Sequence, residues 1–133
     1  AVVPAVPAAA QATAPSPDAS LVCPGSSTLS ASSTGTTISA GPGNYLSNAN
    51  CRWTFSGISP ITVMFNDMQT EANYDFVKVY DGPDATLSRQ LRQFSGSQGR
   101  GVAVTSSGTS LTITFSSDGS VEASGFEAVV TTN

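Results

Sequence analysis

Acidic side chains are the groups of this sequence best suited to chemistry, because it has nine of them and no histidine. Five of the nine fall within 18 residues: Asp67, Glu71, Asp75, Asp81 and Asp84. Carboxylate oxygens are the ligands that Ca²⁺ prefers, and carboxylates from separate loops can converge on one ion. Without a cation, gathered carboxylates would repel one another. The pattern therefore indicates either a cation site or a solvated acidic surface that binds nothing, and both interpretations stay open at this point.

The composition argues against several classes of function. Without histidine, the chain has no Ser-His-Asp or Cys-His machinery and no histidine metal site. A carboxylate pair could hydrolyse a glycoside, but nothing places two carboxylates across a cleft, so we expect no enzyme. Lys and Arg number 5 against 9 Asp and Glu, a net charge of −4, which leaves no basic footprint for nucleic acid. No apolar run reaches the roughly 18 residues of a membrane span, so we expect no membrane insertion.

The chain of 133 residues has the length of one domain, and 39% hydrophobic residues argue against disorder throughout. Residues 1–20 are rich in Ala, Pro and Val, and their four prolines favour an extended tail over a helix or a central strand. Val2, Val3 and Val6 have no partner within this tail. We expect these valines to dock on the tail's own domain or on a neighbouring molecule, and residues 21–133 to form the domain.

Cys23 and Cys51 are the two cysteines, and a disulfide between them would close a loop of 29 residues. Such a cross-link would restrict the unfolded chain by roughly 3.6 kcal/mol. The alternative is two buried free thiols in a cytosolic protein, whereas a zinc site does not fit, since two cysteines without histidine cannot complete its shell. The chain starts at Ala1 without a charged or long apolar leader, so we expect a secreted protein whose signal peptide has been removed.

From residue 21 onward, runs of β-branched and aromatic residues alternate with breaks rich in glycine and proline. Apolar side chains recur at every second position of a run, as in Ile61, Val63 and Phe65, which predicts half-buried strands. The strands expected are Thr36–Ser39, Arg52–Phe55, Ile61–Phe65, Phe76–Tyr80, Arg89–Phe94, Val102–Thr105, Leu111–Phe115 and Phe126–Val130. No segment has a convincing helical period, so the sequence predicts an all-β, antiparallel β-sandwich with Trp53 in its core.

Several short motifs follow one another in a characteristic order. They are Cys51-Arg52-Trp53-Thr54-Phe55, the stretch YDFVKVYDG at 74–82, the stretch LTITFSSDG at 111–119, and Gly125-Phe126. Together and in this order they resemble the CUB domain, an extracellular β-sandwich of jelly-roll type. The resemblance covers Cys23 to Val130 and implies a jelly-roll-type sandwich, a secreted protein and no catalytic activity.

The resemblance also implies a Ca²⁺ site. Many CUB domains hold Ca²⁺ through a Glu, the Asp of the Tyr-Asp pair and the Asp of the Ser-Asp pair, with a supporting Tyr. The matching residues here are Glu71, Asp75 and Asp118, supported by Tyr45, with backbone carbonyls near Ser120 as further ligands. Ca²⁺ is therefore the cofactor that the resemblance implies.

The cysteine spacing suits the first disulfide of the family, Cys23–Cys51, and the sequence departs from the family pattern in two places. The positions of the second disulfide that CUB domains often have correspond to Asn73 and Ser95, so that bridge is absent. The segment from Glu71 to Asp75 is also shorter than usual.

Two functions from different classes fit these observations. The first is a structural or adhesive protein that assembles with itself into a filament or oligomer, each subunit docking its tail on a neighbour. The alternative is a calcium-dependent extracellular module that recognises a protein or a glycan. The two are compatible, because calcium could order loops at a subunit contact.

Overall fold

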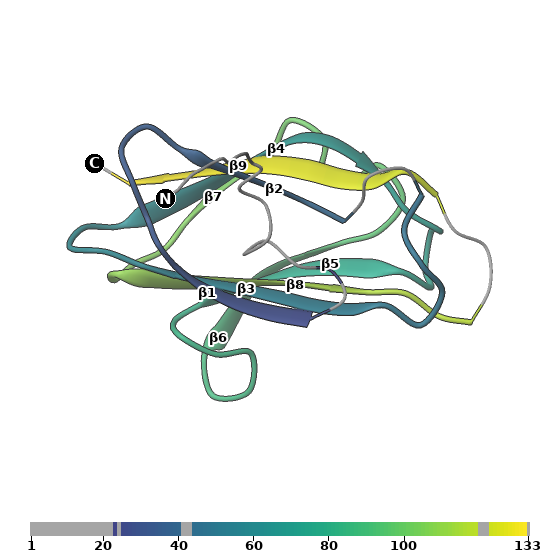
Figure 1. Ribbon diagram of the computed structural model, residues 1–133, viewed down its shortest axis with the longest axis horizontal. Helices are drawn as coiled ribbons and strands as arrows, with labels where there is room; N and C mark the ends of the chain where they lie inside the picture. The colour runs from purple at the N-terminus through teal and green to yellow at the C-terminus, as the bar shows by residue number, and fades with distance from the viewer. Residues whose placement is uncertain (1–22, 24, 41–43, 120–122, 133) are drawn as a thin grey trace, which may run out of the picture.

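The computed structural model describes residues 23, 25–40, 44–119 and 123–132. Within these ranges the chain forms β-strands and no helix. The strands are β1 (Gly25–Ser30), β2 (Thr36–Ser39), β3 (Asn50–Ser56), β4 (Ile61–Gln69), β5 (Phe76–Asp81), β6 (Arg89–Phe94), β7 (Ala103–Thr105), β8 (Ser110–Ser116) and β9 (Gly125–Thr132). They make two sheets that face each other as a sandwich (Figure 1), which confirms the predicted fold class.

The strand order brings distant parts of the sequence side by side. One sheet has five strands in the order β1-β3-β8-β5-β6, and the other has four in the order β2-β9-β4-β7. Strands β3 and β8 pair along their whole length, from Asn50 opposite Ser116 to Ser56 opposite Ser110. All pairings are antiparallel except that of β1 with β3, which is parallel. The parallel pair is possible because β2, in the opposite sheet, lies on the connection between them.

The core lies between the two sheets and follows the predicted alternation. Trp53 and Phe55 of β3 are fully buried, and the Trp53 ring meets Phe126 of β9 edge to face, 5.5 Å between centroids. The other inward positions of the long strands are also buried: Ile61, Val63, Phe65, Val77, Val79, Leu111, Ile113, Phe115, Ala128 and Val130. Each large apolar side chain buried here stabilises the fold by about 1.5–3 kcal/mol, so the sandwich is held mainly by these facing rows.

Strand β1 is the one element that the sequence did not predict. Its six residues, Gly25 to Ser30, contain one large apolar side chain, Leu29, and otherwise glycine and hydroxyl residues. Its place comes from tertiary contacts instead. Gly25 to Ser30 pair with Cys51 to Ser56, and the Cys23–Cys51 disulfide fixes the start of β1 against β3. The disulfide expected from the sequence is thus confirmed.

The first and last described residues, Cys23 and Thr132, lie at opposite ends of the sandwich. Strand β1 starts beside Cys23, opposite Cys51 of β3. Strand β9 finishes at the other end, where the Thr132 N–H donates to the Ser32 carbonyl at 3.1 Å and the Thr132 hydroxyl donates to the Pro60 carbonyl at 3.0 Å. These contacts anchor β9 to the loops that follow β1 and β3.

Some expectations fall on residues that the structure does not describe. Val2, Val3 and Val6 lie outside the described residues, as does Ser120. The docking of the tail and the division at residue 20 therefore stay predictions. Among the described residues, no helix has the length and apolar character needed to cross a membrane.

Candidate metal centre

Three carboxylates from separate segments meet at one end of the sandwich. Glu71 and Asp75 belong to the β4–β5 connection, and Asp118 follows β8. One carboxylate oxygen from each lies within 4.8 Å of the others. The antiparallel pairing of β5 with β8 explains the meeting, because Phe76, at the start of β5, lies opposite Ser116, at the end of β8. The structure therefore brings together the three residues that the sequence proposed as ligands.

Asp75 is the centre of the cluster and has no solvent exposure. Its Oδ2 accepts a hydrogen bond from the Tyr45 hydroxyl at 2.5 Å, and its Oδ1 accepts one from the Asp118 N–H at 2.9 Å. A buried carboxylate with two donors is held in one orientation, since any other rotamer would leave both donors unsatisfied. Asp75 thus links its own β4–β5 connection to the β2–β3 connection through Tyr45, and to the segment after β8 through Asp118.

Tyr45, the supporting residue that the resemblance implies, contacts the cluster from the β2–β3 connection. Its ring is 2% exposed and packs edge to face on Phe115, and its hydroxyl accepts the Glu71 N–H at 3.1 Å while donating to Asp75. Burial and the hydrogen bond to Asp75 raise the pKa of Tyr45 well above its ordinary value, so the hydroxyl stays protonated. Gly125 makes room for this ring, because a Cβ there would approach Tyr45 to 3.3 Å and Ala40 to 2.9 Å.

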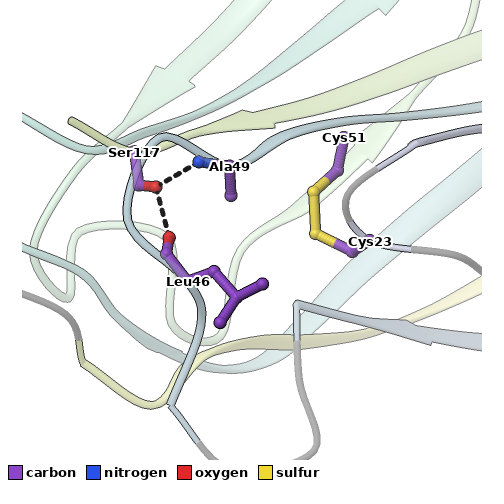
Figure 2. Close-up of a disulfide and its surroundings, with 5 residues drawn as sticks. All are labelled: Cys23, Leu46, Ala49, Cys51 and Ser117. Carbon is purple, nitrogen blue, oxygen red and sulfur yellow. Dashed lines mark hydrogen bonds between the residues drawn. A yellow bond between two sulfur atoms is a disulfide. The ribbon is translucent and has the colours of Figure 1, made fainter. Parts of the chain in front are cut away.

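The loop that carries Asp118 is held by its neighbour Ser117, a role that the sequence analysis did not assign. The Ser117 hydroxyl donates to the Leu46 carbonyl at 2.6 Å and accepts the Ala49 N–H at 2.8 Å (Figure 2). The Asn48 N–H donates to the Asp118 carbonyl at 2.7 Å. Figure 2 places this clamp next to the Cys23–Cys51 disulfide. The sequence marks this residue through its position, since Ser117 directly precedes the proposed ligand in the FSSD motif.

The short Glu71–Asp75 segment is a tight turn in which the Asp75 N–H donates to the Glu71 carbonyl at 3.0 Å. Asn73 in this turn has a positive φ of 71°, and its N–H donates to the Ser95 hydroxyl at 3.1 Å. These are the two positions that correspond to the family's second disulfide. A hydrogen bond therefore joins the same two segments that a covalent bridge would join.

Thr70 adds a second connection between these segments. Its N–H donates to the Gly96 carbonyl at 3.0 Å, and its hydroxyl accepts the Gly96 N–H at 2.8 Å. The shortened turn is thus tied to the β6–β7 connection by three hydrogen bonds, and it still delivers Glu71 and Asp75 to the cluster.

The remaining acids of the 67–84 stretch have other partners. Asp67 forms an ion pair with Arg100 at 3.0 Å. Asp81 accepts the Ser107 hydroxyl at 2.6 Å, and the hydrogen bonds from Ser107 lower the pKa of this carboxyl below its usual value. Asp84 accepts backbone N–H groups of its own loop, the shortest from Leu87 at 2.6 Å, and these lower its pKa. Of the five acids in this stretch, Glu71 and Asp75 therefore belong to the carboxylate cluster, whereas the other three bind an arginine or stabilise loops.

The chemistry of the cluster suits a calcium ion. Three carboxylates supply three to six hard oxygens, and water and main-chain carbonyls commonly complete the six to eight that Ca²⁺ takes. Mg²⁺ fits less well, because it demands near-ideal octahedral geometry and retains its waters. The protein atoms give the group three formal negative charges within 4.8 Å, which a divalent cation would largely neutralise.

Exposed apolar side chains lie on the loops of this end. Leu46 and Tyr74 are each 62% exposed, and they lie in the connections that also carry Tyr45 and the pair Glu71 and Asp75. Isolated exposed apolar residues are common on protein surfaces. Leu46 and Tyr74, however, lie on the loops that form the carboxylate cluster, so this end of the sandwich is both apolar and acidic.

Comparison with known proteins places most of the chain in one family. The model of the CUB domain matches residues 23–129. Human Tolloid-like protein 2 is 36% identical over 97 residues, which cover 68% of this chain and 9% of that protein. The zinc metalloproteinase nas-39 of Caenorhabditis elegans is 33% identical over 91 residues, covering 63% of this chain and 10% of that protein. The chain thus spans about a tenth of the length of these two relatives.

Solved structures have the same fold. The crystal structure of the MASP-1 CUB2 domain bound to Ca²⁺ is similar with a TM-score of 0.64 and 21% identity, covering 77% of this chain and 96% of that one. The extracellular region of zebrafish Gpr126/Adgrg6 is similar with a TM-score of 0.67 and 25% identity, covering 78% of this chain and 14% of that one.

Proposed function

This chain belongs to the CUB domain family, and from that premise we propose that it is a calcium-dependent extracellular binding module. CUB domains are non-catalytic modules of extracellular proteins, many of them calcium-dependent. The observation that carries the proposal is the meeting of Glu71, Asp75 and Asp118 within 4.8 Å. The Ca²⁺ in the MASP-1 CUB2 structure supports it as a property of a protein with the same fold.

The bound ion would organise the end of the sandwich. It would join the β4–β5 connection, through Glu71 and Asp75, to the segment after β8, through Asp118. Three carboxylates and one Ca²⁺ leave a net charge of −3 + 2 = −1 at the site. A residual negative charge beside the exposed Leu46 and Tyr74 suits a partner that offers a lysine or arginine next to an apolar side chain. We infer that the ligand is an extracellular protein with such a basic, partly apolar patch.

Asp118→Asn is expected to reduce calcium affinity at least about tenfold, because it removes one of three charged ligands while keeping the size of the side chain. The fold should persist, since Asp118 binds Asp75 through its main-chain N–H, which the substitution leaves in place. Isothermal titration with Ca²⁺ measures the affinity. Thermal unfolding measures the linked stabilisation, about 2.7 kcal/mol when Ca²⁺ is at 100 times the wild-type Kd.

The matched control is Glu127→Gln, which removes one exposed carboxylate from β9 and should leave calcium affinity unchanged. Equal calcium affinities for the Asp118→Asn protein and the wild type would refute the proposed ligand set. Wild-type protein that neither binds Ca²⁺ nor gains thermal stability from it would refute the calcium-dependent function itself.

We also propose self-assembly through residues 1–20 as a second function, supported by the apolar Val2, Val3 and Val6 in a proline-rich stretch whose one charged side chain is Asp18. Removing residues 1–20 is expected to convert a filament or oligomer into a monomer. Light scattering and electron micrographs of the intact and truncated chains measure this. A monodisperse monomer for the intact chain at high concentration would exclude self-assembly, and the binding-module proposal would stand unaffected.

A further inference from the structure

The outer face of the five-stranded sheet carries two of the chain's five cations. Arg52 on β3 lies opposite Thr114 of β8, and Lys78 on β5 lies opposite the same Thr114 from the other side. Arg52 is exposed, and Thr114 and Lys78 are half-buried. Two strand spacings separate the Cα atoms of the two cations by about 10 Å. The register thus makes a row of two positive charges with a hydroxyl between them.

Arg52 differs from Arg89 and Arg100 in its pairing, and it also differs from Arg92, whose guanidinium lies over the Phe94 ring at 5.0 Å. Arg89 and Arg100 form ion pairs with Asp81 at 3.8 Å and with Asp67 at 3.0 Å. In the described part of the chain, Arg52 has no carboxylate within 4.0 Å and no side-chain hydrogen bond. With respect to the described residues, the five donors of the guanidinium are therefore available.

Asp84 is an opposing charge near Arg52: hydrogen bonds from its own loop lower the pKa of this carboxyl most, and Arg52 adds a smaller part. Its Oδ1, however, already accepts the N–H groups of Thr86, Leu87 and Ser88. Asp84 therefore stabilises its own loop first and neutralises Arg52 only in part.

A hollow of about 460 Å³ opens beside Arg52, within the size range of small-ligand sites. Its lining comes from β1, β3, β8 and the β5–β6 loop: Gly25, Ser26, Asn50, Arg52, Ala85 and Thr114. The loop that gives Ala85 lies on the outer side of this sheet (Figure 1), and the Thr112 hydroxyl fixes its start by donating to the Gly82 carbonyl at 2.9 Å. The described residues that line the hollow thus come from three strands and one loop, and none of them carries a carboxylate.

We propose that this hollow binds the anionic group of an acidic glycan, a sugar carboxylate or sulfate, with Arg52 as its main contact. A guanidinium binds such planar or tetrahedral oxyanions through paired, charge-assisted hydrogen bonds. Ser26, Asn50 and Thr114 offer hydroxyl and amide groups that suit the hydroxyls of a sugar ring. Lys78, one strand beyond Thr114, meets the next charge along the glycan chain. The site prefers anions and needs no metal, so it is independent of the carboxylate cluster.

The test uses the whole chain in a chelating buffer with two fluorescent probes, a heparin oligosaccharide for sulfate and a hyaluronan oligosaccharide for carboxylate alone. The net charge of −4 opposes non-specific binding of a polyanion, so binding of either probe reports a local site. Arg52→Gln should weaken binding about tenfold, the loss expected for one charge-assisted contact. Lys78→Gln should weaken it less. Asp84→Asn should strengthen it, because the competing charge is gone.

Arg100→Gln is the matched control, since it removes the same charge from a residue already paired with Asp67. Its affinity should stay within about twofold of the wild type, as expected for an exposed charge outside the site. Equal losses for Arg52→Gln and Arg100→Gln would overturn the proposal. So would wild-type protein that binds neither probe, or that binds a polyglutamate peptide and no glycan. The preferred probe identifies sulfate or carboxylate as the recognised group, and unchanged thermal midpoints verify that each variant is folded.

Discussion

Asp75→Ala is expected to lower the free energy of unfolding by about 2–5 kcal/mol in chelating buffer, where no metal contributes. The substitution leaves two donors of the buried site, the Tyr45 hydroxyl and the Asp118 N–H, without their acceptor. A buried donor without an acceptor costs about 1–3 kcal/mol, and relief of repulsion with Glu71 and Asp118 offsets part of the sum. For a domain of about 110 residues, each kcal/mol lowers the thermal midpoint by roughly 4 °C.

Asp75→Asn separates the two roles of this carboxylate. The amide keeps nearly the same shape and one of the two oxygen acceptors, while its NH2 group faces the second donor. Its loss of stability in chelating buffer should therefore be smaller than that of Asp75→Ala. Both variants should lose the stabilisation by Ca²⁺, because each removes the buried charged ligand. Chemical unfolding with and without Ca²⁺ measures all of these quantities. Equal destabilisation by alanine and asparagine in chelator would show that the acceptor does not hold the two loops.

Loss of the Cys23–Cys51 disulfide is expected to destabilise the fold by about 3–4 kcal/mol, the range for a cross-link that closes a loop of this length. The effect should be concentrated at β1, which has little apolar contact of its own and lies at the edge of its sheet. Urea unfolding of the oxidised and reduced protein measures the difference. Hydrogen exchange of the β1 amides should accelerate most on reduction.

A Cys23→Ala, Cys51→Ala double variant is the companion measurement. The reduced wild type keeps both sulfur atoms in place, whereas the alanine variant also loses the packing of the fully buried Cys51. The variant should therefore be less stable than the reduced protein. Reduction that leaves both the midpoint and the β1 amides unchanged would contradict the role given to this cross-link.

Most of the strands that the sequence predicted share one physical feature, which β6 with its single buried residue lacks. Their apolar residues alternate because one face of each strand meets the opposite sheet, as Val63 and Phe65 or Ile113 and Phe115 do. Strand β1 lacks this signal, since its place depends on pairing with β3 and on the disulfide. Local pattern therefore identifies strands that have a packed face and misses one that is positioned by its neighbour.

The candidate sites differ in how much of each could be predicted from the sequence. Glu71, Asp75 and Asp118 are marked by motif order, which carries information about their loops. Ser117 belongs to the same motif as Asp118, but its main-chain partners, like those of Thr70, are set by the fold and not by the motif. The hollow beside Arg52 depends on which residues face each other across β1, β3 and β8, and on a loop that folds onto them. Such cross-strand neighbours are known only once the register is known.

The passage of the chain from Cys23 at one end of the sandwich to Thr132 at the other has a mechanical consequence. Tension between these two residues runs along the strands, so β9 can leave β2 and β4 only by shearing many hydrogen bonds at once. At the other end the force enters at Cys23 and passes through the disulfide directly to Cys51 of β3. The force therefore does not extend the chain segment between the two cysteines, which are 28 residues apart in the sequence. The oxidised domain would act as a stiff link, and reduction would add slack at one end only.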